Sequence, residues 1–596
     1  MTYYAPLKDM HFVLHELVDL SSVCALPGFD DCSAELVDVV LEEAAHFAHT
    51  VLAPINRQGD EGARWDKGDV VTAPGFKSAW KAYADLGWVG LRAPRLYGGQ
   101  GLPVLVATAV EEMWCSANLA FSLAPLLTLG AIEAIYCHAS NELAARYLPP
   151  MISGKWTGTM NLTEPQAGSD LAQIRTRAVP HEDGSFRITG QKIFITWGEH
   201  DLADNIVHLV LARLPDAPLG VKGISLFIVP KFLVQADGSL GVRNDVRCVS
   251  IENKLGIHGS PTALMSFGDN GGAVGYLVGE PHHGLTYMFT MMNYARLGVG
   301  VEGMAMSERA YQKACQYARE RIQGRAMGSL DTTSVPILHH PDIRRMLMTM
   351  KSQIEAQRAL TLFTATAIDY ATHHPVSLER ERHQSLVNFL IPIVKGWNTE
   401  QANEITSLAV QIHGGMGYIE ETGVAQYMRD ARITSIYEGT TGIQALDLIG
   451  RKIALEKGVT AYSLLARVRD TVEHLNQLGE VKWGKLANQL KHAVDEAQCC
   501  IDYILQYYES RPEWPAAGAV PFLKLMGILL GGWQLARAVV VANSMMSAGH
   551  DDLGFLQAKM ATACFFGDHI LPYVASLARI VLQGADSVVE LDEAWF

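Results

Sequence analysis

The sequence predicts an α+β protein in which a helical segment, a β segment and two further helical segments follow one another. Three observations predict this order. Hydrophobic residues make up 49% and charged residues 19% of the 596 residues, which is enough for a large core spread over several domains. Apolar residues recur at helical spacing in residues 1–150 and again after Gly284. Between them, from about 155 to 280, short runs rich in β-branched and aromatic residues alternate with turn signals.

The first segment contains two strongly apolar helical runs. Residues 36–53 (LVDVVLEEAAHFAHTVLA) place apolar side chains on one helical face, and residues 103–124 follow in the same style. We expect the second helix to stop before Pro125, because proline disrupts a helix interior. Residues 87–102 (GWVGLRAPRLYGGQGL) are rich in glycine and proline and predict a loop between them.

The β segment has strand-like runs at 186–197 (FRITGQKIFITW), 205–214 (NIVHLVLARL) and 223–229 (GISLFIV). Asp183-Gly184 and Asp237-Gly238 are turn dipeptides between such runs. The pattern predicts a small antiparallel sheet or barrel.

The helical segments that follow are long. Residues 304–323 contain neither glycine nor proline, and Pro341 occupies a position that a helical first turn tolerates. Residues 379–412 form another run, in which we expect Pro392 to kink or break the helix. The last stretch, 457–596, has at least two runs separated by residues 511–515. Its most apolar part, 525–536, is too short to span a bilayer, which takes about 20 residues, and reads as a buried helix.

Charge and cysteine content exclude several classes of protein. The net charge of −15 disfavours a nucleic-acid-binding protein. Nine cysteines, an odd number without a CxxC pair, indicate a reduced chain that has no disulfide framework. The first residues (MTYYAPLKDMHFVLHEL) lack the pattern of a signal peptide. We therefore expect a cytoplasmic protein without a membrane span.

A glycine motif at residues 298–303 (GVGVEG) fits the GxGxxG pattern of dinucleotide-binding proteins. That interpretation requires a preceding strand, whereas the Met-rich residues 285–297 look helical, so we favour close helix packing. The adjacent histidines His282-His283 and His339-His340 lack metal-ligand spacing, and we expect no metal site.

Three other motifs each allow a structural or a functional interpretation. Residues 163–170 (TEPQAGSD) are either a simple turn or a loop that faces a flat polar ligand. Residues 411–418 (QIHGGMGY) are either a helix C-cap or a ligand loop with accessible amides. Residues 437–442 (YEGTTG) place a glutamate that is either a solvated charge or a general base.

Taken together, these motifs resemble the acyl-CoA dehydrogenase family of flavoproteins. TEPxxGSD, GxKxFIT, YAxER, QIHGGMGY and RDARITSIYEGTTGIQ occur in that family's order and spacing, over residues 35–455. The resemblance implies a helical N-terminal domain (1–157), a small middle β-barrel (158–282) and a C-terminal four-helix bundle (283–455), here followed by an additional helical domain (456–596). The leader and the tail resemble a long bacterial subgroup that includes broad-range medium- to long-chain and 3-methylthiopropanoyl-CoA dehydrogenases.

The resemblance also implies FAD as cofactor and a role for each matching residue. Glu438 stands where the family has its catalytic base, which removes the α-proton of an acyl-CoA while flavin N5 accepts the β-hydride. The expected FAD contacts are Met160, Leu162, Thr163, Phe194, Thr196, Arg321, Gln411, Gly415 and Thr440. The expected substrate contacts are Ser169, Asn293, Arg296, Tyr437 and Gly439.

The implied product is a trans-2-enoyl-CoA, in fatty acid β-oxidation or methylthiopropanoyl-CoA catabolism. The implied partners are an electron-transfer flavoprotein and a second copy of the chain, in a homodimer or a dimer of dimers. Two alternatives remain open at this point: an acyl-CoA oxidase that uses oxygen, and a non-catalytic flavoprotein or scaffold.

Overall fold

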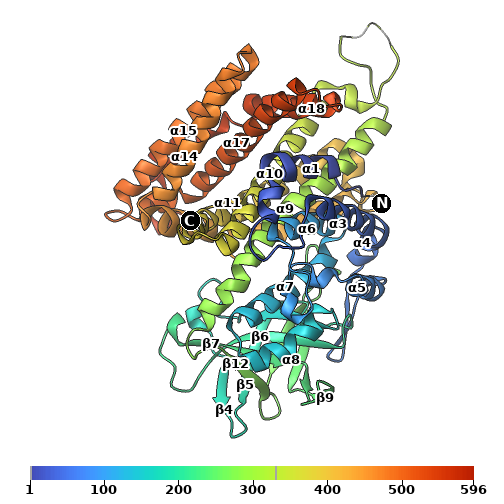
Figure 1. The fold of residues 1–596 in the computed structure, drawn as a ribbon, viewed down its shortest axis with the longest axis vertical. Helices are drawn as coiled ribbons and strands as arrows, with labels where there is room; N and C mark the ends of the chain where they lie inside the picture. The colour runs from blue at the N-terminus through green and yellow to red at the C-terminus, as the bar shows by residue number, and fades with distance from the viewer. Residues whose placement is uncertain (1–2, 329, 331) are drawn as a thin grey trace. The chain divides into compact units, whose positions relative to one another are not determined.

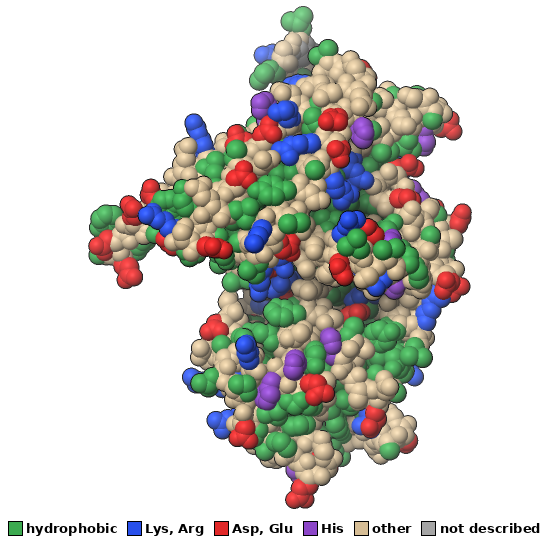
Figure 2. Space-filling view, turned by 60° about the vertical axis from the view of Figure 1, so that its left-hand side comes forward, with side chains coloured by type: hydrophobic (Ala, Val, Ile, Leu, Met, Phe, Trp, Pro, Cys, Tyr) green, Lys and Arg blue, Asp and Glu red, His purple; other side chains and the backbone are tan. Residues whose placement is uncertain are grey.

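Helical periodicity before residue 155 and after 284, and strand periodicity between them, produce the expected order of elements in the computed structural model (Figure 1). It describes residues 3–328, 330 and 332–596. Two compact units form. The first contains Glu43–Pro103 and Met113–Gly298, and the second contains Ala5–Glu42, Val104–Glu112 and Val299–Phe596. On the face shown in Figure 2, basic and acidic side chains are interspersed.

The first unit is built on a mixed sheet. Its strands pair in the order β10-β11-β5-β12-β7-β6-β3, and β4 pairs with both β5 and β6, which closes the ring β5-β12-β7-β6-β4. The strands are β3 (Trp156–Asn161), β4 (Arg177–Pro180), β5 (Phe186–Thr196), β6 (Asn205–Arg213), β7 (Ile224–Pro230), β10 (Val246–Ile251), β11 (Thr262–Phe267) and β12 (Ala273–Val278). The two-stranded sheets are β1 (Arg64–Asp66) with β2 (Asp69–Val71), and β8 (Phe232–Val234) with β9 (Leu240–Arg243).

The expected small antiparallel sheet or barrel is antiparallel in most of its pairs, but β3 runs parallel to β6, and β4 pairs parallel with β6 at Arg177 and Arg213. A parallel pair needs a long connection, and the segment between β3 and β6 supplies it, including β4 and β5. Helix α7 (Leu119–His138) packs on β3 at Gly158, where an added Cβ would lie 2.4 Å from the Ala131 side chain. The other helices of this unit are α4 (Ala53–Asp60), α5 (Phe76–Asp85) and α8 (Asn141–Ile152).

Pro125 does not end a helix, contrary to the expectation from sequence. The chain breaks earlier, at Asn118, between α6 (Val104–Ala117) and α7. Asn118 is extended (φ −158°, ψ 92°), and its side chain accepts a hydrogen bond from the Phe121 backbone N–H at 3.1 Å. An N-cap of this kind starts a new helix with a polar side chain, so Pro125 falls inside α7 after the start has been fixed.

The second unit is helical. Its long helices are α10 (Pro341–His373) and α11 (Ser377–His413), which pack against each other, and α9 (Gly284–Glu320) continues into this unit. Pro341 occupies the first turn of α10, as expected. Pro392 does not break α11, since the helix runs on to His413. Shorter helices are α1 (Leu7–His11), α2 (Leu20–Cys24), α3 (Ala34–Phe47), α12 (Val424–Ala431) and α13 (Thr441–Asp447).

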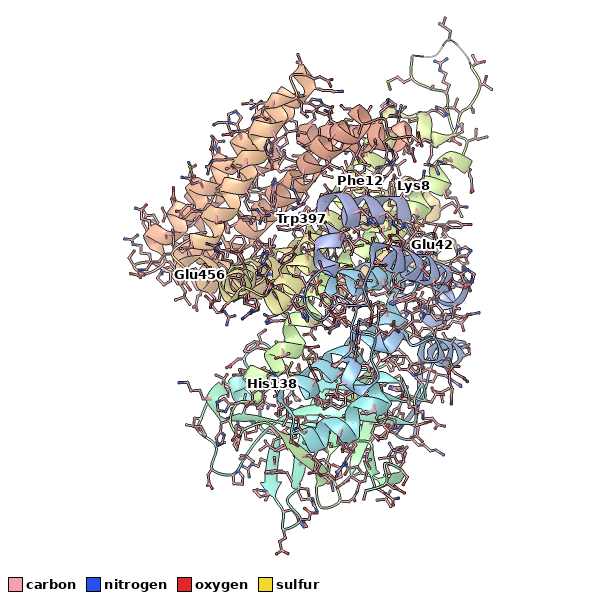
Figure 3. The ribbon with its side chains drawn as sticks, in the orientation of Figure 1. Lys8, Phe12, Glu42, His138, Trp397 and Glu456 are labelled. Atoms are coloured by element: carbon pink, nitrogen blue, oxygen red, sulfur yellow. The ribbon has the colours of Figure 1, made fainter. Side chains whose placement is uncertain are left out.

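The tail is helical throughout and packs on α10 and α11. Its helices are α14 (Val459–Gln477), α15 (Val481–Tyr507), α16 (Glu513–Ala517), α17 (Ala519–Ser547), α18 (Leu553–His569), α19 (Tyr573–Gln583) and α20 (Asp586–Val589). Gly527 and Gly531 of α17 face Trp397 of α11, which is labelled in Figure 3; an added Cβ would lie 2.2 Å and 2.6 Å from its ring atoms. The tail therefore belongs to the core of the second unit.

Three segments are apolar and long enough to cross a membrane: Leu119–His138, Ala519–Ser547 and Leu553–Gln583. In the first two, 89% and 83% of the most apolar window is buried inside the protein, against 39% in the third. Core packing therefore accounts for the hydrophobicity of the first two.

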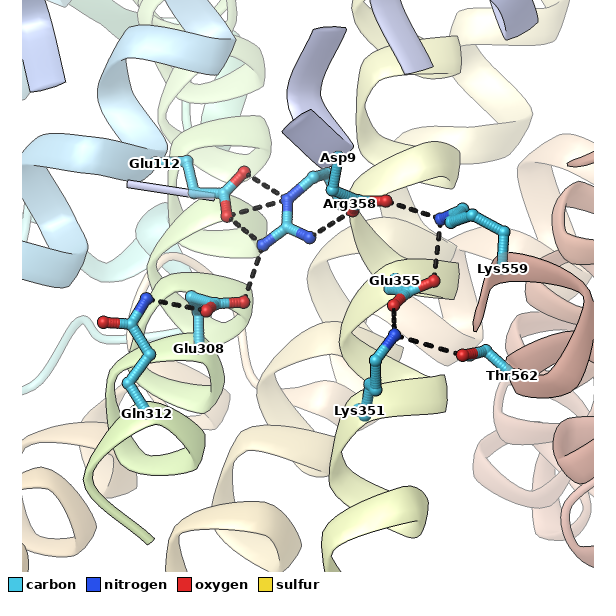
Figure 4. Close-up of polar contacts among 9 residues, drawn as sticks. All are labelled: Asp9, Glu112, Glu308, Gln312, Lys351, Glu355, Arg358, Lys559 and Thr562. Carbon is cyan, nitrogen blue, oxygen red and sulfur yellow. Dashed lines mark hydrogen bonds and ion pairs between the residues drawn. The ribbon is translucent and has the colours of Figure 1, made fainter. Parts of the chain in front are cut away.

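A buried ion network joins α1, near the N-terminus, to other helices of the second unit (Figure 4). The Arg358 guanidinium donates to both Glu112 carboxylate oxygens at 2.6–3.0 Å, to Asp9 at 2.5 Å and to Glu308 at 2.8 Å. Lys559 donates to the other Asp9 oxygen at 2.5 Å. These five side chains come from α10, α6, α1, α9 and α18, so one cluster holds five helices together.

Candidate active site

Glu438 lies in a sharply turned loop between a 3-10 turn (Arg432–Ser435) and α13. Its φ is +53°, and Gly439 follows with φ +85°. A left-handed backbone costs a residue with a Cβ about 1 kcal/mol or more, so it persists only where the surroundings impose it. Strain of this kind is typical of functional positions.

Hydrogen bonds hold the loop on its C-terminal side. The Lys395 ammonium donates to the Gly439 carbonyl at 2.7 Å, and the Gln444 amide donates to the Glu438 and Gly439 carbonyls at 3.3 Å and 3.2 Å. The Thr440 hydroxyl accepts from the Ile443 N–H at 3.3 Å and caps α13. The half-buried Glu438 carboxylate is thus carried by a rigid turn, which suits a group that must meet one particular proton.

A second carboxyl group lies on the N-terminal side of the loop. The Tyr437 hydroxyl donates to Glu302 Oε2, and the Glu302 side chain is fully buried on α9. Burial, with a smaller contribution from the nearby Glu438, raises the pKa of Glu302 to about 8 against the opposing effects of Tyr437 and Lys395. Sequence analysis missed Glu302 because it lies inside the GVGVEG run, which we assigned to helix packing alone.

The packing interpretation of GVGVEG is confirmed. An added Cβ at Gly300 would lie 2.7 Å from Val394, and one at Gly303 would lie 2.9 Å from the Asn398 backbone. Both contacts bring α9 close to α11. No strand precedes the glycines, since they lie within α9.

In the first unit, the residues expected at the flavin ring come from β3, β5 and the loop after β3. Thr163 and Thr196 are half-buried, and neither hydroxyl forms a hydrogen bond within the described part of the chain. The Thr163 carbonyl accepts from the Ile193 N–H at 2.9 Å, which ties the loop after β3 to β5. Met160 and Leu162 are 9% exposed. Phe194 is 59% exposed and left-handed (φ +58°), so its ring is turned out of the sheet.

A buried ion pair lies beneath this surface. Lys192 donates to Glu164 at 2.8 Å and to the Leu162 carbonyl at 2.9 Å. Glu164 also accepts from the Thr176 hydroxyl at 2.6 Å and the Arg175 N–H at 2.7 Å. Although burial opposes ionisation, Lys192 and these hydrogen bonds lower the pKa of Glu164 to about 2. The turn in TEPQAGSD is therefore built around an anchored carboxylate. A sequence signal existed, because the two-residue period from Ile188 places Lys192 on the buried face.

The remaining expected FAD contacts lie at exposed positions of the second unit: Arg321, Gln411, Gly415 and Thr440. The Tyr317 ring stacks on the His413 ring at 4.3 Å, so the end of α9, with Arg321, lies beside the end of α11, with Gln411. The expected substrate contacts divide by exposure. Ser169 and Asn293 are exposed, Tyr437 and Gly439 are half-buried, and Arg296 is buried.

One group of side chains has the composition of a metal site. Nitrogen atoms of His11 and His15 and a carboxylate oxygen of Asp38 lie within 4.8 Å of one another. Both histidines already contact the same Asp38 oxygen, at 2.9 Å and 2.8 Å. Ordinary His–Asp hydrogen bonds account for the cluster.

Comparison with known proteins assigns the family. Four family models match in succession: the acyl-CoA dehydrogenase N-terminal domain (37–155), middle domain (159–270) and C-terminal domain (282–454), and an acetyl-CoA dehydrogenase C-terminal-like domain (464–592). The chain belongs to the acyl-CoA dehydrogenase family. It is an oxidoreductase acting on CH–CH bonds of acyl-CoA thioesters.

Two full-length relatives support this assignment. A 3-methylmercaptopropionyl-CoA dehydrogenase of Ruegeria pomeroyi is 48% identical over 590 residues, covering 99% of each chain. A broad-specificity linear acyl-CoA dehydrogenase of Mycobacterium tuberculosis, FadE5, is 34% identical over 610 residues, covering 100% of each. The fold resembles that of an acyl-CoA dehydrogenase from Bacillus anthracis solved with FAD, with a TM-score of 0.74 at 21% identity, covering 94% of this chain and 90% of that one.

Proposed function

We propose that this enzyme oxidises an acyl-CoA to the trans-2-enoyl-CoA, with Glu438 as the base that removes the α-proton. The observation that carries the proposal is the turn at Glu438. Its backbone is left-handed, hydrogen bonds anchor it on both sides, and it carries one half-buried carboxylate. A proton α to a thioester is weakly acidic, so its removal requires a carboxylate in a fixed position. The Glu438 backbone N–H is the group of this chain that we assign to the thioester oxygen as charge develops there.

The cofactor is FAD, which supplies the acceptor for the β-hydride when it is bound. The donor set of the first unit fits a flavin ring. Thr163 and Thr196 offer two hydroxyls that form no hydrogen bond within the described part of the chain, and the exposed Phe194 ring offers a flat apolar surface. Met160 and Leu162 complete this set with apolar side chains. We assign these five residues to the flavin, where they orient the ring and exclude water.

We assign the exposed residues of the second unit to the adenosine and phosphate part of FAD. Arg321 supplies a charge for a phosphate, Gln411 and Gly415 supply polar and backbone groups, and Thr440 lies next to the base. In this proposal Arg321 and the Gln411–Gly415 loop reach the FAD of a second copy, so the enzyme works as a homodimer or a dimer of dimers.

The CoA part of the substrate is assigned to Ser169, Asn293 and Arg296, and the acyl part to Tyr437 and Gly439. We propose 3-methylmercaptopropionyl-CoA, or a straight acyl-CoA of similar length, as the preferred substrate. The support is the 48% identity to an enzyme named for that substrate, along the whole chain. We further propose that an electron-transfer flavoprotein takes the electrons and that the enzyme is cytoplasmic.

Anaerobic reduction of the purified holoenzyme by a panel of acyl-CoAs tests this function. We expect the visible flavin absorbance to disappear most completely with 3-methylmercaptopropionyl-CoA or an unbranched short acyl-CoA. If no acyl-CoA bleaches the flavin, the protein is a non-catalytic flavoprotein. In air, formation of hydrogen peroxide at the rate of turnover would identify an oxidase instead, whereas reduction of an electron-transfer flavoprotein supports the dehydrogenase.

A further inference from the structure

Glu302 is a buried carboxyl group to which the reaction above assigns no role. It lies on α9, where Gly300 and Gly303 allow close contact with α11, and its side chain is 0% exposed. A carboxyl group in such a position needs hydrogen-bond partners, because burial without them costs several kcal/mol. Glu302 Oε2 accepts from the Tyr437 hydroxyl, and Oε1 has no hydrogen-bond partner among the described residues.

The contact between Tyr437 and Glu302 bears on the proposed base because Tyr437 directly precedes Glu438 in the chain. Tyr437 is covalently followed by Glu438, and beyond Glu438 the Gly439 carbonyl is held by Lys395. The base is thus anchored on one side by a hydrogen bond to α9 and on the other by a hydrogen bond to α11. Without the Tyr437–Glu302 contact, the N-terminal side of the turn keeps the backbone hydrogen bond from the Tyr437 N–H to the Ile433 carbonyl at 3.1 Å, but it loses the side-chain contact that holds it to α9.

Four titratable groups bear on the Glu302 carboxyl, from three different elements. Tyr437 and Glu438 belong to the loop, Lys395 to α11 and Glu111 to α6. Glu438 and Glu111 disfavour a negative charge on Glu302, as burial does, while Tyr437 and Lys395 favour it. Burial is the largest of these effects and raises the pKa of Glu302 to about 8. Glu302 is therefore mostly neutral at pH 7, and Glu438 has no second charged carboxylate at that position.

We propose that Glu302 is a positioning residue for the reaction: it holds the Glu438 turn in place through the Tyr437 hydroxyl, and it does so as an uncharged acid. This inference rests on the proposed function of Glu438. It assigns to Glu302 no contact with substrate or FAD.

Three variants test the proposal in the full-length holoenzyme. Glu302→Leu removes the acceptor and should lower kcat about 10- to 100-fold with little change in KM, since misplacement of a catalytic group affects the chemical step. Tyr437→Phe removes only the hydroxyl and should lower kcat by a similar factor. The double variant should be no worse than either single variant, because both remove the same contact. Tyr573→Phe, at a 59% exposed tyrosine of the tail, is the matched control.

Glu302→Gln separates charge from positioning. The amide keeps an acceptor for Tyr437 and cannot ionise, so kcat at pH 7 should stay within about threefold of the wild type. The pH profiles of the two proteins should coincide below pH 7 and separate above pH 8, where only the wild type ionises at this position. FAD content and thermal midpoint, measured for every variant, identify any protein that has failed to fold.

The outcomes distinguish this inference from the function on which it rests. If the wild type reduces its flavin with an acyl-CoA but Tyr437→Phe turns over as fast as Tyr573→Phe, the role of Glu302 is wrong and the function stands. Additive losses in the double variant, or pH profiles that coincide throughout, would also overturn it. If none of the acyl-CoAs tested reduces the flavin of the wild type, the proposed function itself is wrong.

Discussion

Removal of the Arg358 guanidinium should destabilise the second unit where Asp9 of α1 contacts α10. Arg358 is 1% exposed and is the cation that pairs Glu112 (0% exposed) and Glu308 (6% exposed) in Figure 4. In Arg358→Met these carboxylates stay buried without it. Breaking a buried ion pair by removal of one partner costs about 3–5 kcal/mol. Asp9 keeps its second cation, Lys559, so we expect the cost to remain in this range and not to double.

Hydrogen exchange read by mass spectrometry measures this effect where it arises. A cost of about 3–5 kcal/mol corresponds to roughly 100- to 4,000-fold faster exchange in peptides that open with the network, at tenfold per 1.4 kcal/mol. The affected peptides should contain α1 and the middle of α10. Arg382→Met is the control, because its contact with Glu379 is exposed and worth about 0–1 kcal/mol.

Replacement of Glu112 by a neutral residue should restore part of the stability that Arg358→Met loses. Glu112 carries a raised pKa because burial outweighs its pairing with Arg358, so Glu112→Gln combined with Arg358→Met removes the unpaired charge. We expect the double variant to recover at least about 1 kcal/mol relative to Arg358→Met. Exchange in Arg358→Met no faster than in Arg382→Met would show that the buried network contributes no more to stability than a surface ion pair, and would contradict this prediction.

Further predictions concern packing and pH. Gly527→Ala should destabilise the tail by about 1–3 kcal/mol, because the new methyl group overlaps Trp397. The control, Gly484→Ala, has open space around it and should be neutral or stabilising by up to about 1 kcal/mol. Thermal midpoints that fall equally in the two variants would contradict this prediction. The pKa of Glu164 is lowered to about 2, so its ionised form stabilises the fold above pH 4.5, and this contribution is lost as the pH falls toward 2. Thermal midpoints measured from pH 6 to pH 3 should therefore fall less steeply in Glu164→Gln than in the wild type, and parallel curves would contradict the pairing with Lys192.

The fold followed from periodicity where one face of an element is buried and the other is not. The strand runs and the long helices were predictable because their apolar residues repeat with periods of two and 3.6. The predicted helix ends at Pro125 and Pro392 were wrong. A proline ends a helix only where packing does not offset the lost hydrogen bond, and both prolines are buried in the core. The parallel pairing of β3 with β6 depends on contacts far apart in sequence, which local pattern does not encode.

The candidate site was predictable to the extent that motifs mark it. The loop at Glu438 was found from YEGT and from its resemblance to a family. Glu302, Lys395 and Glu112 were not found, because a single charged residue inside an apolar helix gives no sign of its partner in another helix. Lys192 was missed as well, although strand alternation gave a signal, since it places this residue inside and an inward lysine requires a carboxylate.

In the proposed reaction, the Glu438 carboxylate removes the α-proton of the acyl-CoA. The most direct measurement is the anaerobic reduction of Glu438→Gln by the best acyl-CoA, followed by stopped-flow absorbance. We predict that the variant binds FAD as the wild type does and that its flavin is reduced at least ~10³-fold more slowly, because the first bond cannot break without the base. Reduction at a rate close to that of the wild type would exclude Glu438 as the base.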